Sequence, residues 1–459
     1  MFDRGFASCN PEKVKYILRS MPSAAFTTLG CKVNQYETQK ILESFAEKGF
    51  TIVPFESPAD VYVINTCSVT SDAERKSRYT IRRANRHNPE AKVVVTGCAT
   101  QMGLNKGEPT QDAHVLVPNP AKLDALNYLL RAFPEIGNDL AEPDQSELKL
   151  HQGRTRATLK VQDGCSVMCS YCSIPYTRPG MVSRPFSQVL EEAQKLAQLG
   201  YNEAILTGVL IGAYGPESGS EGPGFEELVT LLAKESGLAR LRISSIEMHQ
   251  VTDPIIELAQ EGIVVPHFHI PLQSGDTGVL RDMNRRYDQK MYIDRCLEIQ
   301  KRIPDVTLTT DIMVGFPTET HERFQSSVEV CEAVGYHSAH VFTFSPRWGT
   351  PADQWGDPVT PAEKSDRRLR LMEVTRRTGE SHYRKFLGRT MRVLLESKPG
   401  KDGLMQGLTD NYLSVKVAAP ASMGRSLVWA NLDEFRDGVI HGELAPPPRL
   451  DLPALRVLR

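Results

Sequence analysis

The sequence carries, at positions 164–172, the stretch Gly164-Cys165-Ser166-Val167-Met168-Cys169-Ser170-Tyr171-Cys172, which holds three cysteines in one short loop. Three residues separate the first two cysteines, and two residues separate the second and third. Thiolates at this spacing can wrap one small iron–sulfur cluster. Because a [4Fe–4S] cluster has four irons, three thiolates leave one iron open to a substrate or cofactor. The alternative is a zinc site, which normally takes four protein ligands, but no further Cys or His follows within a few residues of Cys172.

The segment from about 155 to 385 alternates predicted strands with predicted helices. The strands are expected at residues 157–162, 203–207, 241–246, 264–270, 307–313 and 338–344. Six such units predict an α/β fold with a partial (β/α)6 barrel of parallel strands. Ligands of such barrels bind on the loops at the carboxyl ends of the strands, and the cysteine loop follows the first strand.

Other loops at the expected barrel mouth carry candidate cofactor-binding residues. They are Gly208 after the second strand, and Ser245 and Glu247 after the third. The glycines of the 207–215 turn allow a close approach of the backbone to a ligand. A hydroxyl that bonds the local backbone is an equally good explanation of Ser245.

Two histidines of the fourth predicted strand, His267 and His269, are two residues apart and therefore share one face. Such a pair can bind a metal. Because no third ligand is near them in the sequence, we expect them to form hydrogen bonds in the barrel interior instead. Arg285 and Arg286 follow this strand and are candidates for binding a cofactor carboxylate or an RNA phosphate.

The first segment, to about residue 135, predicts a smaller parallel α/β sheet. Strands are expected at residues 24–29, 60–66 and 91–96, with helices over 34–48, 71–87 and part of 121–133. Each strand is followed by a cysteine, namely Cys31, Cys67 or Cys98. Because the carboxyl ends of parallel strands meet at one edge, these thiols should converge there and suit a second three-thiolate cluster. The alternative is three buried structural cysteines, since cysteine is among the most buried residue types.

Arginines gather in two places that suit contact with RNA phosphates. Arg75, Arg78 and Arg82 lie on the predicted helix 71–87, whose alternative role is a solvated surface. Arg376 and Arg377 belong to a basic belt that leads into the last segment and consists of Arg367, Arg368, Arg370, Arg376, Arg377, Arg384, Lys385, Arg389 and Arg392.

The last segment predicts five short strands, at residues 391–396, 403–408, 413–417, 426–431 and 438–443. This pattern favours a small β-barrel of the oligonucleotide-binding (OB) kind. Tyr412 is a candidate for stacking on an RNA base. The alternative is a barrel that only caps the rest of the chain.

At 459 residues the chain is expected to form two or three domains. We predict an N-terminal extension at 1–21, the small α/β domain at 22–135, a link at about 134–154, the barrel at 151–383 and the C-terminal barrel at 386–449. Nine cysteines without an apolar signal segment indicate a reducing, cytoplasmic location. The net charge of −2 gives no global attraction to nucleic acid. No apolar run approaches the roughly twenty residues that span a bilayer, so we expect no membrane partner.

Motifs along nearly the whole chain resemble one family. The cysteine loop with Tyr171 is similar to the CxxxCxΦC signature of the radical S-adenosylmethionine (SAM) enzymes, where Φ is aromatic. The runs Leu29-Gly30-Cys31-Lys32-Val33-Asn34-Gln35-Tyr36-Glu37-Thr38, Asn65-Thr66-Cys67 and Thr96-Gly97-Cys98 resemble the N-terminal domain of the radical SAM methylthiotransferases. Residues 407–412 resemble the TRAM domain, an RNA-binding module.

The resemblance implies two [4Fe–4S] clusters and SAM as cofactors. The open iron at the cysteine loop would chelate SAM, and the reduced cluster would generate a 5′-deoxyadenosyl radical. The candidate residues at the barrel mouth would contact SAM, and the resemblance adds Tyr171 in the cysteine loop, Gln273 after the fourth strand, and Gly315 and Phe316 after the fifth. Cys31, Cys67 and Cys98 would hold the auxiliary cluster that delivers sulfur. The family usually carries Asn where this chain has Leu210, so no polar role is carried over to that position.

The resemblance also implies a tRNA-modifying enzyme. The Lys32–Thr38 run is similar to the branch of the family that methylthiolates C2 of N6-threonylcarbamoyladenosine at position 37, beside the anticodon. The expected partners are the tRNA anticodon loop, an external electron donor and a sulfur source. Alternative substrates are N6-isopentenyladenosine in tRNA and an aspartate of a ribosomal protein. The alternative outside catalysis is a zinc- and RNA-binding protein.

Overall fold

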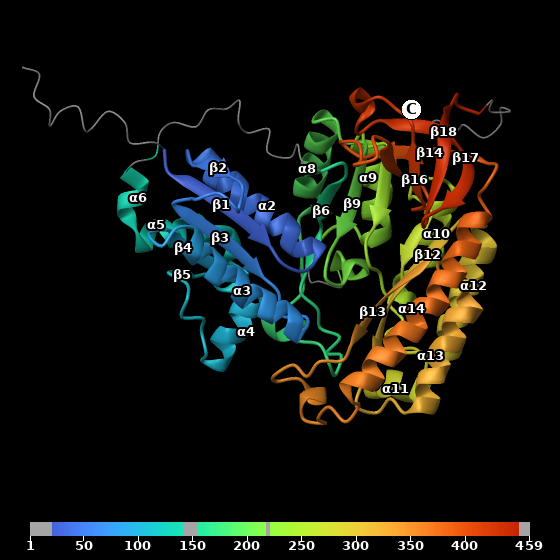
Figure 1. Cartoon of the computed structure of the whole chain (residues 1–459), viewed down its shortest axis with the longest axis horizontal. Helices are drawn as coiled ribbons and strands as arrows, with labels where there is room; N and C mark the ends of the chain where they lie inside the picture. Colours follow the sequence, from blue (N-terminus) through green and yellow to red (C-terminus); the bar gives the residue numbers. More distant parts are fainter. Residues whose placement is uncertain (1–20, 139, 141–153, 217–220, 449–459) are drawn as a thin grey trace, which may run out of the picture. The chain divides into compact units, whose positions relative to one another are not determined.

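Two compact units make up the chain in the computed structural model (Figure 1), which describes residues 21–138, 140, 154–216 and 221–448. The first unit comprises described residues within 1–68 and 72–150, and the second comprises those within 69–71 and 151–459. Nearly all of the predicted extension at 1–21, including Cys9, and most of the predicted link lie outside the described residues. None of the described helices is long and apolar enough to cross a membrane.

The first unit is built on a five-stranded sheet with the order β2-β1-β3-β4-β5, in which every pair is parallel. The strands are β1 (Ser23–Thr28), β2 (Thr51–Val53), β3 (Val61–Thr66), β4 (Lys92–Gly97) and β5 (Val115–Leu116). The helices are α2 (Lys32–Glu47), α3 (Ser71–His87), α4 (Cys98–Lys106), α5 (Ala125–Ala132) and α6 (Pro134–Asn138), with the 3-10 helix η1 (Asn119–Asp124). The predicted parallel sheet is confirmed, and two short edge strands are added to it.

Alternate side chains of the strands enter two apolar cores, one on each face of this sheet. Val61 and Val63 of β3 pack with Phe45 of α2 on one face. Tyr62 of β3 packs with Ile81 of α3 on the other face. Because both faces are covered, the strands are apolar throughout, and polar and thiol groups are left for the strand ends.

The second unit contains six parallel strands arranged as a half-barrel, as the sequence predicts. They are β6 (Ala157–Lys160), β9 (Glu203–Thr207), β10 (Arg240–Ile243), β11 (His267–His269), β12 (Thr307–Val314) and β13 (Ser338–Thr343). Two three-stranded sheets, β6-β9-β10 and β11-β12-β13, are joined by isolated bridges from Leu241 to Val264 and from Ser245 to His269.

Helices cover the outside of the half-barrel (Figure 1). The helices of this unit are α7 (Ile174–Thr177), α8 (Phe186–Gln198), α9 (Phe225–Glu235), α10 (Asp253–Gln260), α11 (Thr277–Asp282), α12 (Gln289–Arg302), α13 (His321–Val334) and α14 (Pro361–Arg384), with the 3-10 helices η2 (Ile211–Ala213), η4 (Met248–Gln250) and η5 (Pro351–Asp353). The short strands β7 (Gln162–Asp163) and β8 (Val182–Ser183) form an antiparallel pair beside the cysteine loop. Helix α14 begins with a capping box at Thr360 and Glu363 and contains most of the predicted basic belt.

The two faces of the half-barrel strands differ sharply in polarity. The outward face carries Leu206, Ile243 and Phe268, which belong to the large apolar core beneath the helices. The opposite face carries the polar side chains of Glu203, Arg240, Arg242, His267, His269, Thr309 and Asp311. Part of this polar face, at Arg240 and His267, is covered by the C-terminal segment of the chain.

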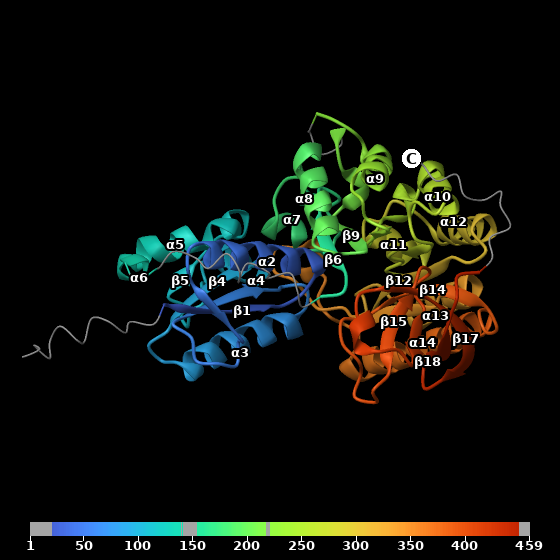
Figure 2. The ribbon, with the colours of Figure 1, turned by 90° about the horizontal axis from the view of Figure 1, so that it is seen from above.

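A closed five-stranded barrel with the order β14-β15-β16-β18-β17 ends the second unit, as predicted. Its strands are β14 (Thr390–Leu395), β15 (Met405–Thr409), β16 (Ser414–Val417), β17 (Leu427–Arg436) and β18 (Val439–Ala445), with the 3-10 helix η6 (Ala421–Met423). Figure 2 shows this barrel in red beside the strands of the half-barrel. The turn after β15 packs on the inner face: Asp410 pairs with Arg240 at 2.8 Å, and the Tyr412 ring stacks on His267 at 4.1 Å.

Candidate functional site

The cysteine loop is held in one conformation by close packing of its backbone. Gly164 has a φ of +75°, and a Cβ atom there would overlap the carbonyl oxygen of Gly180. Met168, between the first two cysteines, also has a positive φ of 53°. Cys169 is buried, whereas Cys165 and Cys172 are half-buried. The thiols are close enough to influence one another electrostatically, and burial raises the pKa of Cys172 to about 12.

Arg285 is the cationic partner of this loop. Its Nη1 atom lies 3.5 Å from the sulfur of Cys169, and its Nε atom donates to the hydroxyl of Tyr287 at 3.1 Å. Its other terminal nitrogen forms an ion pair with Glu247. The Arg285 side chain is 4% exposed, so its guanidinium faces the thiols with little competition from water. Of the two possible roles predicted for Arg285, a place beside the cofactor site fits this burial better than contact with RNA.

These residues fit an iron–sulfur cluster with three thiolate ligands. The backbone amide of Val167 lies 3.4 Å from the sulfur of Cys165 and donates toward it. Amide and guanidinium hydrogen bonds to sulfur are among the interactions that tune such clusters.

Three more of the predicted cofactor-binding residues, Gln273, Ser245 and Gly208, lie in loops that follow strands of the half-barrel. Gln273 is 8% exposed and has a φ of +65°, and its Oε1 atom is buried without a hydrogen-bond partner among the described residues. An orphaned buried oxygen of this kind suits a ligand that brings a donor. Ser245 is exposed and pairs in register with His269. Gly208 packs on Gln162, whose Oε1 accepts from the amides of Val209 and Leu210.

Three other predicted residues have packing roles in the structure. A Cβ atom on Gly315 would overlap the stem of Lys364, so packing alone requires glycine there. Phe316 is fully buried and contacts Tyr171 edge-on, with ring centroids 6.5 Å apart. The amide of Gly315 donates to Glu319 at 2.6 Å. Contact between these residues and a cofactor stays a prediction.

In the first unit, the three predicted cysteines follow three adjacent strands. Cys31 precedes α2 after β1, Cys67 follows β3, and Cys98 begins α4 after β4. The register pairs Thr28 with Asn65 and Thr66 with Gly97, so the three strands end side by side. Cys67 and Cys98 are buried and Cys31 is exposed.

The loops that carry these cysteines are tied together locally. The side-chain amide of Asn34 donates to the carbonyl oxygens of Leu29 and Thr66 at 2.9 and 3.0 Å. A Cβ atom on Gly30 would lie 2.7 Å from the sulfur of Cys67. The amide of Asn119 lies 3.7 Å from the sulfur of Cys98. Three thiols at neighbouring strand ends, one of them open to solvent, fit a second three-thiolate cluster.

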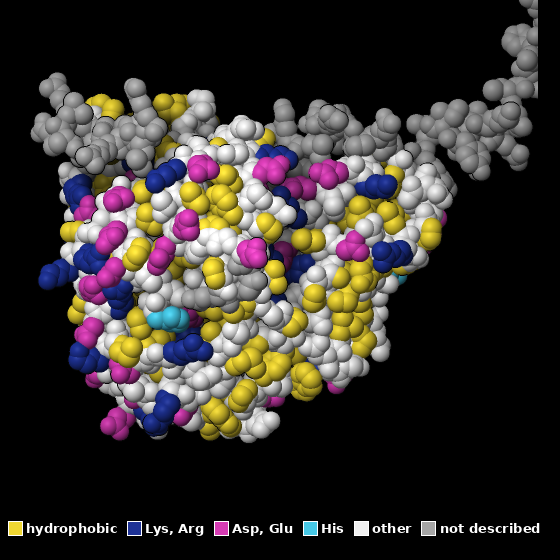
Figure 3. All heavy atoms as spheres, turned by 180° about the vertical axis from the view of Figure 1, so that it is seen from behind, with side chains coloured by type: hydrophobic (Ala, Val, Ile, Leu, Met, Phe, Trp, Pro, Cys, Tyr) yellow, Lys and Arg dark blue, Asp and Glu magenta, His cyan; other side chains and the backbone are white. Residues whose placement is uncertain are grey.

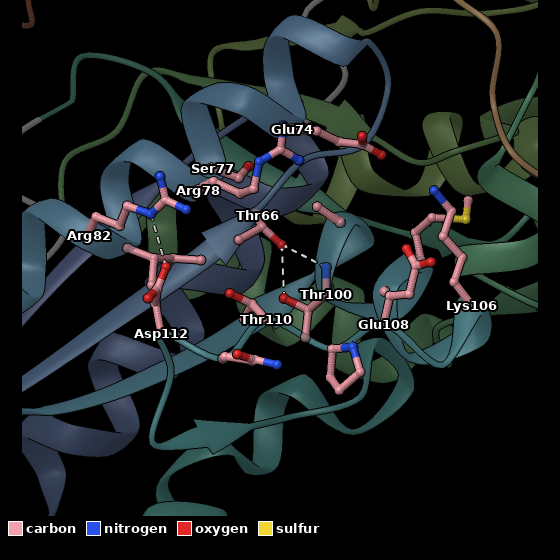
Figure 4. A pocket seen from close by; sticks show the side chains of 16 residues that line it. Thr66, Glu74, Ser77, Arg78, Arg82, Thr100, Lys106, Glu108, Thr110 and Asp112 are labelled. Carbon is pink, nitrogen blue, oxygen red and sulfur yellow. Dashed lines mark hydrogen bonds and ion pairs between the residues drawn. The ribbon is translucent and has the colours of Figure 1, made fainter.

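A cavity of about 450 Å³ lies next to these strand ends in the first unit (Figure 4). Its walls include Thr66 and Thr100, each near one of the cysteines in sequence, and the two hydroxyls lie 3.1 Å apart. Arg78 and Arg82 of α3 also line it, and Arg82 pairs with Asp112 at 3.1 Å. Arg75 lies on the same helix and pairs with Asp72 at 2.8 Å.

The second group of predicted RNA contacts is engaged with acidic neighbours. Arg376 pairs with Glu373 and Glu380, and Arg377 pairs with Glu332 at 3.2 Å. On the face seen in Figure 3, Lys and Arg side chains are interspersed with Asp and Glu. The paired arginines offer less net positive charge to phosphate than the sequence pattern suggests.

The ring of Tyr412 packs against other residues of the second unit. It stacks on His267 at an angle of 11°, and the guanidinium carbon of Arg242 lies 5.1 Å from its centroid. These contacts give Tyr412 a structural role between the C-terminal barrel and the half-barrel. They explain why an aromatic residue stands in this turn without requiring an RNA base.

The structure brings together one group that the sequence did not reveal. His269 of β11, Asp311 of β12 and His340 of β13 meet on the inner face of the half-barrel. Burial would raise the pKa of Asp311, but hydrogen bonds from the two imidazoles hold it well below its usual range. Asp311 and His340 lie 42 and 71 residues beyond His269, so the sequence around His267 and His269 does not indicate them.

Two family models match the chain. Residues 23–116 match the family described as "Uncharacterized protein family UPF0004", and residues 159–331 match the radical SAM superfamily. A solved radical SAM methyltransferase, TsrM from Kitasatospora setae, aligns over 72% of this chain and 77% of its own with 13% identity and a TM-score of 0.49.

Curated relatives are similar over most of their length. Threonylcarbamoyladenosine tRNA methylthiotransferase MtaB of Bacillus subtilis is 36% identical over 86% of this chain and 90% of its own. The protein of the same name from Aquifex aeolicus is 33% identical over 87% of this chain and 98% of its own. The tRNA-2-methylthio-N(6)-dimethylallyladenosine synthase of Bacillus cytotoxicus is 31% identical over 92% of this chain and 85% of its own.

Proposed function

Since this chain belongs to the family of radical SAM tRNA methylthiotransferases, we propose that it methylthiolates C2 of N6-threonylcarbamoyladenosine in tRNA. The cofactors of this chemistry are SAM and a [4Fe–4S] cluster at Cys165, Cys169 and Cys172. When bound, they supply the radical and the methyl group, and the chain binds, aims and shields them.

The observation that carries this proposal is the cysteine loop with its buried cation. Arg285 places positive charge beside Cys169 and is itself oriented by Glu247 and Tyr287. A cluster with three thiolates is anionic, so a desolvated guanidinium favours its binding. Gln273 adds a buried oxygen that a SAM ammonium or hydroxyl group would satisfy.

The substrate branch rests on the relatives. The similar proteins named for threonylcarbamoyladenosine include the one at 36% identity, whereas those named for dimethylallyladenosine are at 30–31%. The Lys32–Thr38 run in α2 favours the same branch by its resemblance. N6-dimethylallyladenosine, also called isopentenyladenosine, therefore remains the second candidate.

A second [4Fe–4S] cluster at Cys31, Cys67 and Cys98 is part of the proposal. Its support is the register of β1, β3 and β4: these strands end side by side, and a cysteine follows each of them. We propose that this cluster receives sulfur from an external source and that a separate protein donates electrons. The RNA contacts proposed are Arg75, Arg78 and Arg82 of α3 and, with less support because of their ion pairs, Arg376 and Arg377.

Nucleoside mass spectrometry of tRNA tests the reaction. A bacterial strain that lacks its own threonylcarbamoyladenosine methylthiotransferase should regain 2-methylthio-N6-threonylcarbamoyladenosine when it expresses this chain. The Cys169→Ala variant should restore none. In a second strain, which lacks only the isopentenyladenosine enzyme, the chain should not restore 2-methylthio-N6-isopentenyladenosine. If the chain restores that nucleoside and fails to restore 2-methylthio-N6-threonylcarbamoyladenosine in the first strain, it belongs to the isopentenyladenosine branch.

Iron analysis after anaerobic reconstitution tests the second cluster. The chain should hold about eight irons, and the triple variant Cys31→Ala, Cys67→Ala, Cys98→Ala should hold about four. That variant should still cleave SAM reductively but form no methylthio product. The matched control is Cys296→Ala with Cys331→Ala, since both lie in the apolar core and should leave the iron content unchanged. About four irons in the unaltered chain would refute the second cluster.

A further inference from the structure

His269, Asp311 and His340 form a cluster that none of the roles proposed above uses. They come from β11, β12 and β13, three neighbouring parallel strands. The register pairs His269 with Thr309 and Asp311 with His340, so the three side chains point to the same face of the sheet. They are 15%, 28% and 80% exposed, which places them between the interior of the half-barrel and solvent.

The ligand atoms of the cluster converge on one point. The Nε2 atom of His269 lies 3.1 Å from Oδ2 of Asp311, and the Nδ1 atom of His340 lies 3.3 Å from Oδ1. All three ligand atoms lie within 4.8 Å of one another, and the two imidazole centroids are 5.7 Å apart. Ligand atoms bound to one cation at about 2.0–2.2 Å are separated by similar distances. Among the described residues, no other trio of His, Cys, Asp and Glu side chains meets this criterion.

Thr309 orients the inner imidazole from behind. Its hydroxyl lies 3.0 Å from Nδ1 of His269 and 3.1 Å from Nε2 of His267. When a cation is bound, Nδ1–H of His269 donates to this hydroxyl and the hydroxyl donates to His267, which leaves the Nε2 lone pair of His269 for the cation beside Asp311. Metal-bound histidines usually have their second nitrogen fixed by such a hydrogen bond.

We propose that His269, Asp311 and His340 bind one divalent d-block cation of the zinc class. Two imidazole nitrogens and one carboxylate oxygen form a donor set that suits zinc or iron(II) better than magnesium or calcium. Three protein ligands leave at least one position for water or another oxygen ligand. Hydrogen bonding alone is a weak reason for this arrangement, because an ion pair with a largely exposed histidine adds little stability.

Zinc binding to the anaerobically reconstituted full-length protein tests this site. With both cysteine triads occupied by iron, the protein should bind one Zn²⁺ per chain in equilibrium dialysis. Zinc K-edge absorption should show nitrogen and oxygen ligands at about 2.0–2.1 Å and no sulfur at about 2.3 Å. His340→Ala removes an exposed ligand and should weaken zinc binding at least about tenfold while the iron content stays unchanged.

His321→Ala is the matched control, because His321 is an exposed histidine of the same unit that lies outside the cluster. It should bind zinc as the unaltered protein does. Asp311→Asn should weaken binding as His340→Ala does. The proposal is overturned by the absence of stoichiometric zinc, by sulfur in the zinc shell, or by equal affinity in His340→Ala and His321→Ala. None of these readouts depends on tRNA methylthiolation, so failure of the proposed reaction is distinguishable.

Discussion

Gly164 shows how one backbone position supports the cysteine loop. Its φ of +75° favours glycine, and the space where a side chain would begin is filled by the backbone of Gly180. Gly180 has nearly the same φ, +76°, yet a Cβ atom there would meet nothing within 4 Å. Alanine substitutions at the two glycines therefore separate the cost of a positive φ from the cost of steric overlap.

We expect Gly164→Ala to lose the iron of the loop cluster, about four irons per chain, because the loop must move to admit the new methyl group. Gly180→Ala is the control and should keep its iron, at a stability cost of about 1–2 kcal/mol from the left-handed conformation. Iron analysis and thermal unfolding of both variants would measure this. Equal iron contents in the two variants would contradict the packing argument.

At the scale of elements, α14 packs on β13 and β12 through neutral histidines. His382 of α14 bonds the hydroxyl of Thr307 at 2.9 Å, and the ring of His337 lies 4.7 Å from that of Tyr383. Burial lowers the pKa of His337 to about 4. Burial, with the nearby His337 and Lys385, lowers the pKa of His382 to about 3.

These shifts predict that acid weakens the packing of α14. Above pH 6.5 both histidines are neutral in the folded and unfolded chain, so their contribution to stability is complete. As the pH falls from 6.5 toward 4, the unfolded chain binds protons that the folded chain does not, and the free energy of unfolding decreases. From pH 7 to pH 5, His337 alone accounts for about 2 kcal/mol of this decrease.

His337→Phe keeps an aromatic ring and removes the titrating group. The loss of stability between pH 7 and pH 5, measured by urea unfolding, should be smaller in this variant than in the unaltered protein by about 2 kcal/mol. His321→Phe, on the exposed start of α13, should leave the loss unchanged. A His337→Phe variant with the original pH dependence would show that this histidine is not buried as a neutral group.

Strand ends were predictable from the sequence because local signals mark them. Apolar runs that stop at Cys31, Cys67 and Cys98 define where β1, β3 and β4 end, and parallel pairing then places the ends at one edge. The cysteine loop was predictable for the same reason, since its spacing is local. The predicted fourth strand, 264–270, shortens to His267–His269 because Pro266 and Pro271 flank it and lack amide hydrogens.

Long-range pairing limited the rest of the prediction. His340 lies beside Asp311 only because β13 pairs with β12 in one register, and the alternation of the sequence alone does not fix that register. The contacts of Tyr412 with His267 and Arg242, and the ion pair of Arg377 with Glu332, likewise come from pairing across the fold. Residues that the sequence predicts to bind RNA therefore have partners inside the protein.

At the scale of the whole second unit, Tyr412 joins the C-terminal barrel to the half-barrel. Tyr412→Ala should lower the free energy of unfolding by about 1–3 kcal/mol, because it removes the ring between His267 and Arg242. Tyr412→Phe keeps the ring and should retain most of the stability. Thermal unfolding of both variants is the measurement.

A separate measurement of tRNA affinity distinguishes the two roles of Tyr412. If the residue acts only in RNA binding, Tyr412→Ala unfolds at the temperature of the unaltered protein while its affinity for tRNA falls. If Tyr412 has the packing role, Tyr412→Ala should unfold at a lower temperature than the unaltered protein even in the absence of RNA.

The ion pairs under the C-terminal barrel also bear on how such chains can be recombined. Arg240 and Arg242 share Glu203 in the half-barrel, and burial raises the pKa of Glu203 while the two arginines lower it to about 2. Asp410 of the C-terminal barrel completes the charge balance at Arg240. A barrel transplanted from a distant relative would leave this charge unmatched unless its turn brought an acid and an aromatic ring. An exchange of the C-terminal barrel between such enzymes must therefore also carry the residues of the half-barrel that contact it.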